Sequence, residues 1–449
     1  MPTHGTTDTI FAPLTIEGKC GVYVLRISGS KALKCLLSLG ISRRFEHRKA
    51  TLCRLRDRNG SDLDRALVVF FQSPRSFTGE DVCEISLHCS RYIIDRVFSI
   101  LSALDGVRFA ENGEFSKRAF LNGKFDLVQA ESIVDLVNSE TELQHRNAIR
   151  QLSGKNSSYF EKLREDMIDL ASNLEGYLDF PDEDMGIAIQ IESEGKITDL
   201  VARVTQMLDD NNVGIRVKNG IKVSIVGKPN VGKSTLLNFI ANEDLAIVSA
   251  RPGTTRDVLQ ISSIIGGIPV KFFDTAGIRE TSDDIEIEGV RRAVANAKDA
   301  DFRILLLEPD NIAIDPKIKN LIDSNTIILL NKIDLATEEK IKSIELKYPG
   351  LIGISLKHGL NTDKIKGQLL SLIEKTITPF VNSGITQERY RIELLGVLNN
   401  LKKIDFNLQP LEIILEHIRC ASLCVGRITG KINADEILDE IFRKFCIGK

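Results

Sequence analysis

The chain has 449 residues, of which 27 % are charged and 43 % hydrophobic, and its formal net charge is −3 at pH 7. This length predicts two to four domains with ample apolar core. The balanced charge excludes a protein coated in basic residues, so nucleic-acid binding would need a local patch or a partner. Without a signal peptide or a long apolar run, we expect a cytoplasmic protein with no membrane association.

The eight cysteines are scattered without the paired spacing of a metal site. This pattern favours reduced thiols in a cytosolic protein over a disulfide framework. Cys420 and Cys424 are one helical turn apart, and we interpret them as core residues in preference to metal ligands.

Residues 1 to about 120 alternate short apolar runs with turns, and the clearest runs are 22–27, 66–71 and 82–87. One helical pattern near Tyr92–Leu104 interrupts these expected strands. Strands mixed with a helix in this way predict a small α+β domain.

The apolar spacing then changes to a helical period over residues 121–213. Two apolar faces carry this pattern, namely Leu127, Ala130, Val134 and Val137, and then Phe160, Leu163, Met167, Leu170 and Leu174. Residues 214–378 alternate strand and helix patterns, and residues 379–449 are helical again. Expected linkers stand at 214–220 and 379–384. We therefore expect an α/β domain inserted into one helical domain built from two distant segments, because the ends of an inserted domain lie close together.

Residues 227–234 read Gly-Lys-Pro-Asn-Val-Gly-Lys-Ser and fit the phosphate-binding pattern Gly-x-x-x-x-Gly-Lys-Ser. An apolar strand-like run, 222–226, precedes them, and a helix-like run, 235–241, follows. Backbone N–H groups of such a loop and the helix N-terminus bind phosphate oxygens. Lys233 is expected to reach the β- and γ-phosphates, and the Ser234 hydroxyl to ligate magnesium. A chance Gly-rich turn is the alternative, which the strand–loop–helix context disfavours.

Three further motifs follow in order, each at the end of an expected strand. Asp274–Gly277 reads Asp-Thr-Ala-Gly, whose carboxylate can hold magnesium through water and whose glycine N–H can meet a γ-phosphate. Asn331–Asp334 reads Asn-Lys-Ile-Asp, and its final carboxylate can accept both guanine N–H groups, so the expected nucleotide is GTP. Ser355–Lys357 resembles the loop that backs the guanine, with Leu356 where many GTPases have Ala. Together the motifs predict a Ras-like P-loop GTPase domain.

Several blocks outside these motifs are similar to those of one family. They are Asp8–Ala12, Gly21–Gly29, Ser76–Val82, Gly113–Lys124, Asp179–Glu183, Gly253–Asp257 and Cys446–Lys449. On these blocks the chain resembles the MnmE (TrmE) family of tRNA modification GTPases over essentially its whole length. One departure is His88-Cys89-Ser90, where that family usually has His-Gly-Gly.

The resemblance implies a multidomain protein of mixed α/β and α+β class. Residues 1–120 would form an N-terminal folate-binding and dimerisation domain, and residues 121–213 and 379–449 a discontinuous α-helical domain. The GTPase domain, 214–378, would be inserted between these two helical segments.

The resemblance also implies a potassium-dependent, GTP-hydrolysing enzyme that modifies the wobble uridine of certain tRNAs. It would add an aminomethyl or carboxymethylaminomethyl group to carbon five of the uridine. A tetrahydrofolate derivative, in its 5,10-methylene or 5-formyl form, would carry the one-carbon unit. The expected partners are a second copy of the chain and the flavoprotein MnmG (GidA), in a complex of the heterotetramer type.

Motif matching assigns four residues to folate contact: Arg26, Glu84, Lys124 and the C-terminal Lys449. Solvated surface charge is the competing interpretation of the first three. Cys446 is a candidate catalytic residue by the same resemblance, and a packing role remains open for it.

The resemblance further assigns the catalytic switch role in GTP hydrolysis to Glu286, acting through a bridging water. An exposed Glu at a helix start is its alternative. Ras-like enzymes carry a water-orienting Gln after the Asp-Thr-Ala-Gly motif, whereas this chain has Ile278, so the water must be positioned otherwise. Potassium would be held by Asn230, Ser249, the backbone of Arg251, and Thr254, and would replace the charge of an arginine finger. Asn230 could instead serve only as a turn residue.

Magnesium would be ligated by Ser234 and Thr255. The complete set of expected GTP-binding residues is Asn230, Val231, Gly232, Lys233, Ser234, Thr235, Ser249, Ala250, Arg251, Pro252, Gly253, Thr254, Thr255, Asp274, Thr275, Ala276, Gly277, Asn331, Lys332, Asp334 and Ser355.

Two other functions compete with this one. A ribosome-assembly or cell-cycle GTPase would usually carry a basic RNA-binding appendage, and none is evident in the sequence. A prenylated, membrane-anchored GTPase would use Cys446, but a terminal Lys is a poor match to the prenylation signal.

Overall fold

The computed structural model describes residues 8–15, 18, 20–179, 186–209, 212–242, 260–274, 295, 297–314, 316–377, 385–432, 435–445 and 448. The chain forms two compact units. The first comprises Met1–Val134, Arg150–Ala171 and Ser422–Lys449, and the second comprises Asp135–Ile149 and Ser172–Ala421.

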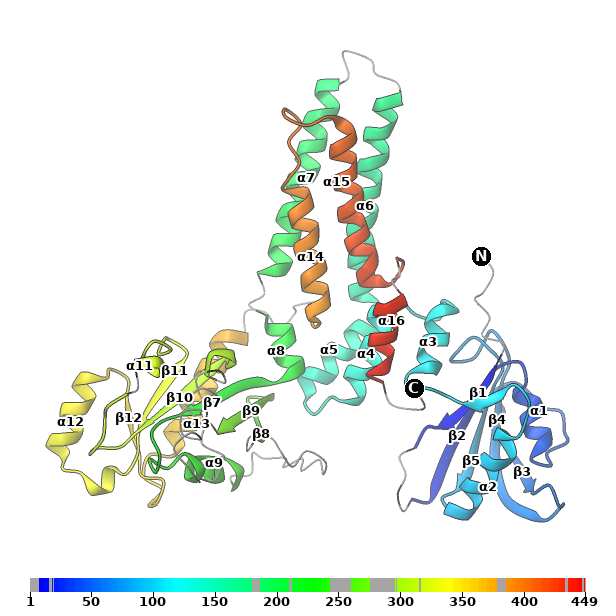
Figure 1. Ribbon diagram of the computed structural model, residues 1–449, viewed down its shortest axis with the longest axis horizontal. Coiled ribbons are helices and arrows are strands. Elements are labelled where there is room, and N and C mark those ends of the chain that lie inside the picture. The colour runs from blue at the N-terminus through cyan, green and yellow to red at the C-terminus, as the bar shows by residue number, and fades with distance from the viewer. Residues whose placement is uncertain are drawn as a thin grey trace, which may run out of the picture. The chain divides into compact units, whose positions relative to one another are not determined.

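The first unit contains a six-stranded sheet (Figure 1). Its strands are β1 (Thr9–Pro13), β2 (Val22–Ser28), β3 (Thr51–Arg56), β4 (Asp62–Phe71), β5 (Val82–His88) and β6 (Val107–Phe109). Their order is β3-β4-β5-β2-β1-β6, and every neighbouring pair is antiparallel except β1 and β6. The three strands expected in this region are therefore present.

Alternation along the central strands gives this sheet two unlike faces. Tyr23, Leu25 and Ile27 are buried in a core with residues of helices α1 (Ala32–Ser38) and α2 (Arg91–Ser102). The intervening residues of β2, Val24 and Arg26, therefore face the other side of the sheet.

The expectation of one helix in this region was wrong, because the structure adds α1 and α3 (Glu114–Leu121). Helix α1 has seven residues, too few for a helical period to stand out in the sequence. Cys35 and Leu36 nevertheless bury one face of α1 in the core, and Phe115 and Ala119 bury one face of α3.

The helical segments that flank the GTPase domain in sequence are α4 (Leu127–Val137), α5 (Glu142–Leu152), α6 (Lys155–Asp179), α7 (Gly186–Leu208), α14 (Glu388–Leu401), α15 (Leu411–Thr429) and α16 (Asp435–Arg443). The expected apolar face of α6, from Phe160 to Leu174, is buried. Val137 departs from expectation, because it is the last residue of α4 and is 52 % exposed. In the second unit α14 packs on α7, although the GTPase domain separates them in sequence (Figure 1).

The sheet of the second unit is mostly parallel. Its strands are β7 (Ile221–Val226), β8 (Gln260–Ile265), β9 (Ile268–Asp274), β10 (Phe302–Leu307), β11 (Thr326–Leu330) and β12 (Ile352–Gly353), in the order β12-β11-β10-β7-β9-β8. Only β8 runs antiparallel to its neighbour. The helices are α8 (Val213–Asn219), α9 (Lys233–Asn242), α11 (Pro316–Lys319), α12 (Glu338–Lys347) and α13 (Asp363–Ile377). Apolar residues fill both sides of β7 and β10, as expected of a parallel sheet.

The expected linker at 214–220 is instead helix α8, which corrects that prediction. Val213 and Val217 are buried on its inner side. Arg216 pairs with Asp301 at 2.7 Å, and Lys218 pairs with Asp135 at 2.8 Å. These contacts order a segment whose two glycines suggested an open linker. The second expected linker, 379–384, lies outside the described residues.

Candidate functional site

The phosphate-binding loop joins the end of β7 to the start of α9, as the motif requires. Gly227 has φ +156°, and a Cβ there would lie 2.5 Å from the carbonyl oxygen of Leu306. Gly232 has φ +104°, in the region that favours glycine, and a Cβ on this residue would lie 2.4 Å from the amide nitrogen of Asn331. The glycines are therefore required by the loop's shape and by close neighbours.

Lys233 is held inside this loop and is only 6 % exposed. Its ammonium donates hydrogen bonds to the carbonyl oxygens of Gly227 at 2.8 Å and Lys228 at 2.7 Å. Ser234 and Thr235, at the start of α9, are exposed. The loop thus presents hydroxyl groups and helix N–H groups outward, which suits phosphate and a hard cation.

The Asn331–Asp334 motif follows β11 and contacts the phosphate-binding loop directly. The Asn331 amide donates to the Val231 carbonyl at 2.8 Å and accepts the N–H of Leu356 at 3.1 Å. Lys332 donates to the carbonyl of Asn230 at 2.9 Å and to the Glu308 carboxylate at 2.6 Å. The motif therefore joins three loops at the carboxyl edge of the sheet.

Asp334 lies beside the Ser355–Lys357 loop that follows β12. A hydrogen bond from Ser355 holds the pKa of Asp334 below its ordinary value, and the nearby His358 and Lys357 act in the same direction. The Nε2 atom of His358 is 3.6 Å from the Asp334 carboxylate. An ionised carboxylate here is the acceptor that two guanine N–H donors need.

The rest of the expected nucleotide site lies outside the described residues. This concerns Ser249, Ala250, Arg251, Pro252, Gly253, Thr254, Thr255, Thr275, Ala276, Gly277, Ile278 and Glu286, and the side chain of Asp274.

In the first unit, Arg26 and Glu84 are directly opposite each other on β2 and β5. The Arg26 guanidinium donates two hydrogen bonds to Glu84 Oε1, at 3.0 and 2.9 Å. The side chains are 13 % and 26 % exposed, so neither is a freely solvated surface charge. The Arg26 guanidinium also lies 4.7 Å from the Phe77 ring centre and 5.4 Å from that of Phe115. Burial lowers the pKa of Arg26, and Glu84 opposes this effect.

Lys124 follows α3 and faces the loop between β4 and β5. Its ammonium donates to the carbonyl oxygen of Pro74 at 2.8 Å, and Asn122 donates to the carbonyl of Thr78 at 2.7 Å. Its side chain and that of Asn122 also lie next to Gly79, which has φ +80°. The structure thus brings Lys124 to the loop that carries Phe77, which in turn packs on Arg26.

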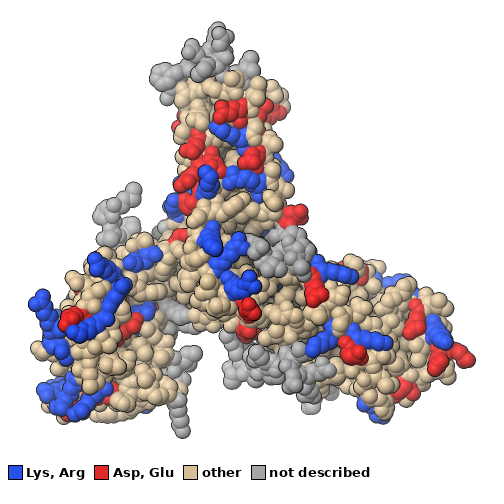
Figure 2. Space-filling model, turned by 180° about the vertical axis from the view of Figure 1, so that it is seen from behind, with Lys and Arg blue, Asp and Glu red and all other residues tan. Residues whose placement is uncertain are grey.

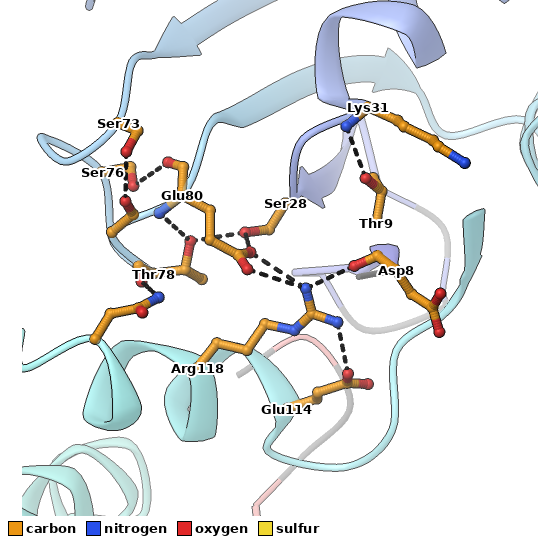
Figure 3. Close-up of polar contacts among 12 residues, drawn as sticks. Asp8, Thr9, Ser28, Lys31, Ser73, Ser76, Thr78, Glu80, Glu114 and Arg118 are labelled. Carbon is orange, nitrogen blue, oxygen red and sulfur yellow. Dashed lines mark hydrogen bonds and ion pairs between the residues drawn. The ribbon is translucent and has the colours of Figure 1, made fainter. Parts of the chain in front are cut away.

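Sequence reasoning missed the ionic network that holds this loop against α3 (Figure 3). The buried Arg118 guanidinium contacts Glu80 at 3.2 Å and Glu114 at 2.9 Å. Glu80 also accepts from Ser28 Oγ at 2.6 Å. The sequence could have indicated the ion pair within α3, because Glu114 and Arg118 are four residues apart. It could not indicate the distant partner Glu80.

The C-terminal segment meets the same unit at β1. Gly448 lies next to the carbonyl of Pro13, with no room for a Cβ. Phe445 is buried with Phe442 in a cluster that Phe125 joins, and Phe125 lies 6.0 Å from Phe77. Cys446 and Lys449 lie outside the described residues.

The Nδ1 atom of His88 donates to the Asp64 carboxylate at 2.7 Å, and the Cys89 thiol donates to the Gly18 carbonyl at 3.1 Å. Among the described residues no cluster of three or more His, Cys, Asp or Glu side chains could hold a metal ion. No helix in this described part of the chain is long and apolar enough to cross a membrane.

A phosphate-binding loop, a guanine-type Asn-Lys-x-Asp motif and a mostly parallel sheet together define a P-loop GTPase domain. Comparison with known families extends this class to the whole chain. A model of the MnmE helical domain matches residues 127–446, and a model of the GTP-binding protein TrmE N-terminus matches residues 9–124. The chain belongs to the MnmE family of tRNA modification GTPases.

Two full-length relatives agree with this assignment. The tRNA modification GTPase MnmE of Rickettsia conorii is 44 % identical, over 98 % of this chain and 100 % of its own length. That of Anaplasma marginale is 43 % identical, over 98 % and 99 % respectively. A crystal structure of Aquifex aeolicus Era bound to GDP.AlF4- is 28 % identical over 34 % of this chain and 56 % of its own, with a TM-score of 0.26. The family assignment confirms the expected resemblance and the expected class of enzyme, a GTP hydrolase.

Proposed function

We propose that this GTP hydrolase modifies the wobble uridine of certain tRNAs, adding an aminomethyl or carboxymethylaminomethyl group to carbon five. The observation that carries the proposal is the match to MnmE family models on both sides of the GTPase motifs, from residue 9 to residue 446. A generic P-loop GTPase would share only the central domain.

In the proposed GTPase reaction, Lys233 exchanges its two carbonyl partners for the β- and γ-phosphates of GTP. Asp334 selects guanine, because its ionised carboxylate accepts two N–H groups that adenine does not offer together. Glu286 orients the attacking water through a bridging water. The aliphatic side chain of Ile278 has no polar atom and cannot perform this role.

Two cations fit the oxygen donors of this site. The exposed Ser234 hydroxyl at the start of α9 suits magnesium, with Thr255 as its second ligand. Asn230 has φ +62° in an exposed turn, so its amide oxygen is accessible to potassium together with Ser249, Arg251 and Thr254. When bound, potassium supplies positive charge between the phosphates.

We further propose that the first unit binds a tetrahydrofolate derivative near Arg26, Glu84 and Lys124. Support comes from the partly buried Arg26–Glu84 pair, which a pteridine could meet with donors and acceptors. Gly448 beside Pro13 supports a C-terminal contribution, because Pro13 pairs with Leu25, the neighbour of Arg26 in β2. Cys446 and Lys449 flank that contact in sequence.

We propose that the enzyme acts in the cytoplasm as a homodimer together with the flavoprotein MnmG (GidA), which supplies the redox step. One edge of the N-terminal sheet is β6, and a strand edge of this kind is commonly covered by a partner.

The decisive experiment is mass spectrometry of tRNA nucleosides from cells that lack the protein. We expect the aminomethyl-type wobble uridines to be absent and to return with the wild-type gene, but not with Lys233→Ala. Wobble uridines that stay fully modified in the deletion strain would refute the proposal.

A further inference from the structure

A strongly basic segment crosses the first unit, although the whole chain has a net charge of −3. Residues 42–56 contain one acidic residue, Glu46, and six exposed cations, namely Arg43, Arg44, Arg48, Lys49, Arg54 and Arg56. In Figure 2 the six-stranded sheet of this unit lies in the lobe at the left, where Lys and Arg cover much more of the face in view than Asp and Glu do. Solubility depends on the net charge of the whole chain and does not explain a local excess of positive charge.

The pairing of β3 with β4 places one more cation beside this segment. Arg54 on β3 lies directly opposite Arg65 on β4, and both are exposed. Like charges at directly opposite positions destabilise a sheet, so this pair does not serve the fold. The carboxylate partner of Arg54 is Asp62, at 3.6 Å, and Arg56 shares this partner at 3.7 Å.

Most of these guanidinium groups have no carboxylate partner. Within the described part of the chain, Arg43, Arg44, Arg48, Arg65 and Arg75 form no ion pair. Arg48 donates instead to the backbone carbonyl of Arg75 at 3.3 Å, which brings the β4–β5 loop to the same surface. We call Arg48, Arg65 and Arg75, with Lys49, Arg54 and Arg56, the β3 basic surface.

This surface continues into the face of the sheet that carries the candidate folate residues. Arg65, Leu67 and Val69 alternate with buried residues on β4, so they share one face. Val69 is opposite Glu84, and Glu84 is opposite Arg26. Three strand spacings of about 4.8 Å separate β3 from β2, which is about 14 Å across the sheet, and the four residues from Arg65 to Val69 add about 13 Å along β4.

We propose that the β3 basic surface binds the phosphate backbone of the tRNA and leads it toward the Arg26–Glu84 pair. The identity of the RNA rests on the proposed function. Unpaired arginines suit this partner because their planar donors bind phosphate oxygens in pairs. Contacts of this kind position a nucleic acid without reading its sequence.

The test measures binding of a fluorescent tRNA transcript to the full-length protein over a series of salt concentrations. The variant is Arg48→Gln/Arg65→Gln, because both side chains are exposed and neither is in an ion pair. The matched control, Arg91→Gln/Lys342→Gln, removes the same charge from exposed positions on α2 and α12. GTP hydrolysis without tRNA, which the variant should retain at the wild-type rate, verifies folding.

We expect the variant to bind tRNA about tenfold more weakly, and the slope of log Kd against log salt to fall by about 2. The control should match wild type in both quantities. Equal affinity and slope in variant and wild type would overturn the proposal. A variant that binds tRNA with wild-type affinity but no longer binds an acidic protein partner would also overturn the proposal.

Failure of the proposed function would look different. In that case tRNA binding would still depend on Arg48 and Arg65, which supports the surface, while the wobble uridines would stay fully modified in the deletion strain.

Discussion

The side-chain amide of Asn331 donates a 2.8 Å hydrogen bond to the backbone carbonyl of Val231, 100 positions earlier. Its amide oxygen accepts the N–H of Leu356 at 3.1 Å. One buried side chain therefore ties the phosphate-binding loop to the guanine-side loop, so phosphate and base contacts are held in register before nucleotide arrives.

Asn331→Ala should remove both bonds and leave two buried backbone groups without their partners. We expect a loss of about 2 kcal/mol in stability of the GTPase domain. GTP affinity should fall as well, because the two loops are no longer fixed relative to each other. Thermal unfolding and nucleotide titration measure the two effects. Asn320→Ala, at an exposed position, is the control, and equal behaviour of the two variants would disprove the bracing role.

GTP hydrolysis should require potassium. Ile278 offers no polar group to the attacking water, and Asn230 presents an exposed amide in the loop. Replacing potassium by sodium at equal ionic strength should slow turnover by about 10³-fold, the lower range of an arginine-finger effect. Equal rates in the two buffers would rule out a monovalent-cation finger.

Glu286→Ala should abolish hydrolysis while leaving GTP affinity within about twofold of wild type, because an interaction made only in the transition state does not contribute to ground-state binding. Single-turnover rates and equilibrium titration separate the two quantities. Glu288→Ala, two positions away, serves as the charge-matched control. A parallel fall in affinity and rate would show that Glu286 belongs to the binding site.

Folate binding should depend on Glu84 and on residues 446–449. Calorimetry with 5-formyltetrahydrofolate should show weaker binding for Glu84→Ala and for a chain ending at Phe445, while both variants retain GTP hydrolysis. Glu46→Ala removes an exposed carboxylate from the same unit and should bind folate normally. Undiminished affinity in both test variants would remove these residues from the site.

The full-length chain should sediment as a dimer without nucleotide, because the proposed contact is in the N-terminal unit. The GTPase domain alone, residues 214–378, should dimerise only with GDP, aluminium fluoride and potassium, since its switch segments are expected to order around a γ-phosphate. A monomeric full-length chain would contradict the first statement. A fragment that stays monomeric in fluoride and potassium would contradict the second.

The sequence predicted those features that short segments determine by themselves. The phosphate-binding loop could be identified because its glycines, Lys233 and the flanking strand and helix are contiguous. Helix α6 could be identified because its apolar face repeats over about four turns, from Phe160 to Leu174. Neither inference needs a partner from elsewhere in the chain.

Long-range pairs could not be predicted in the same way. Arg26 meets Glu84, 58 positions away, only because β2 and β5 pair in one particular register. The contact between Lys332 and Glu308 depends likewise on β10 lying beside β11. Helix α8 was misjudged because the ion pairs of Arg216 and Lys218, which order it, come from distant residues.

The proximity of Gly448 to Pro13 has a consequence for synthesis of the protein. The ribosome adds roughly 5–20 residues per second, so the first strand emerges on the order of tens of seconds before its C-terminal neighbour. By the end of that interval all the nucleotide-binding motifs have been synthesised, whereas Phe120 and Phe125 still lack the α16 residues that cover them. A nascent or prematurely terminated chain can therefore acquire a nucleotide site before its N-terminal unit is complete.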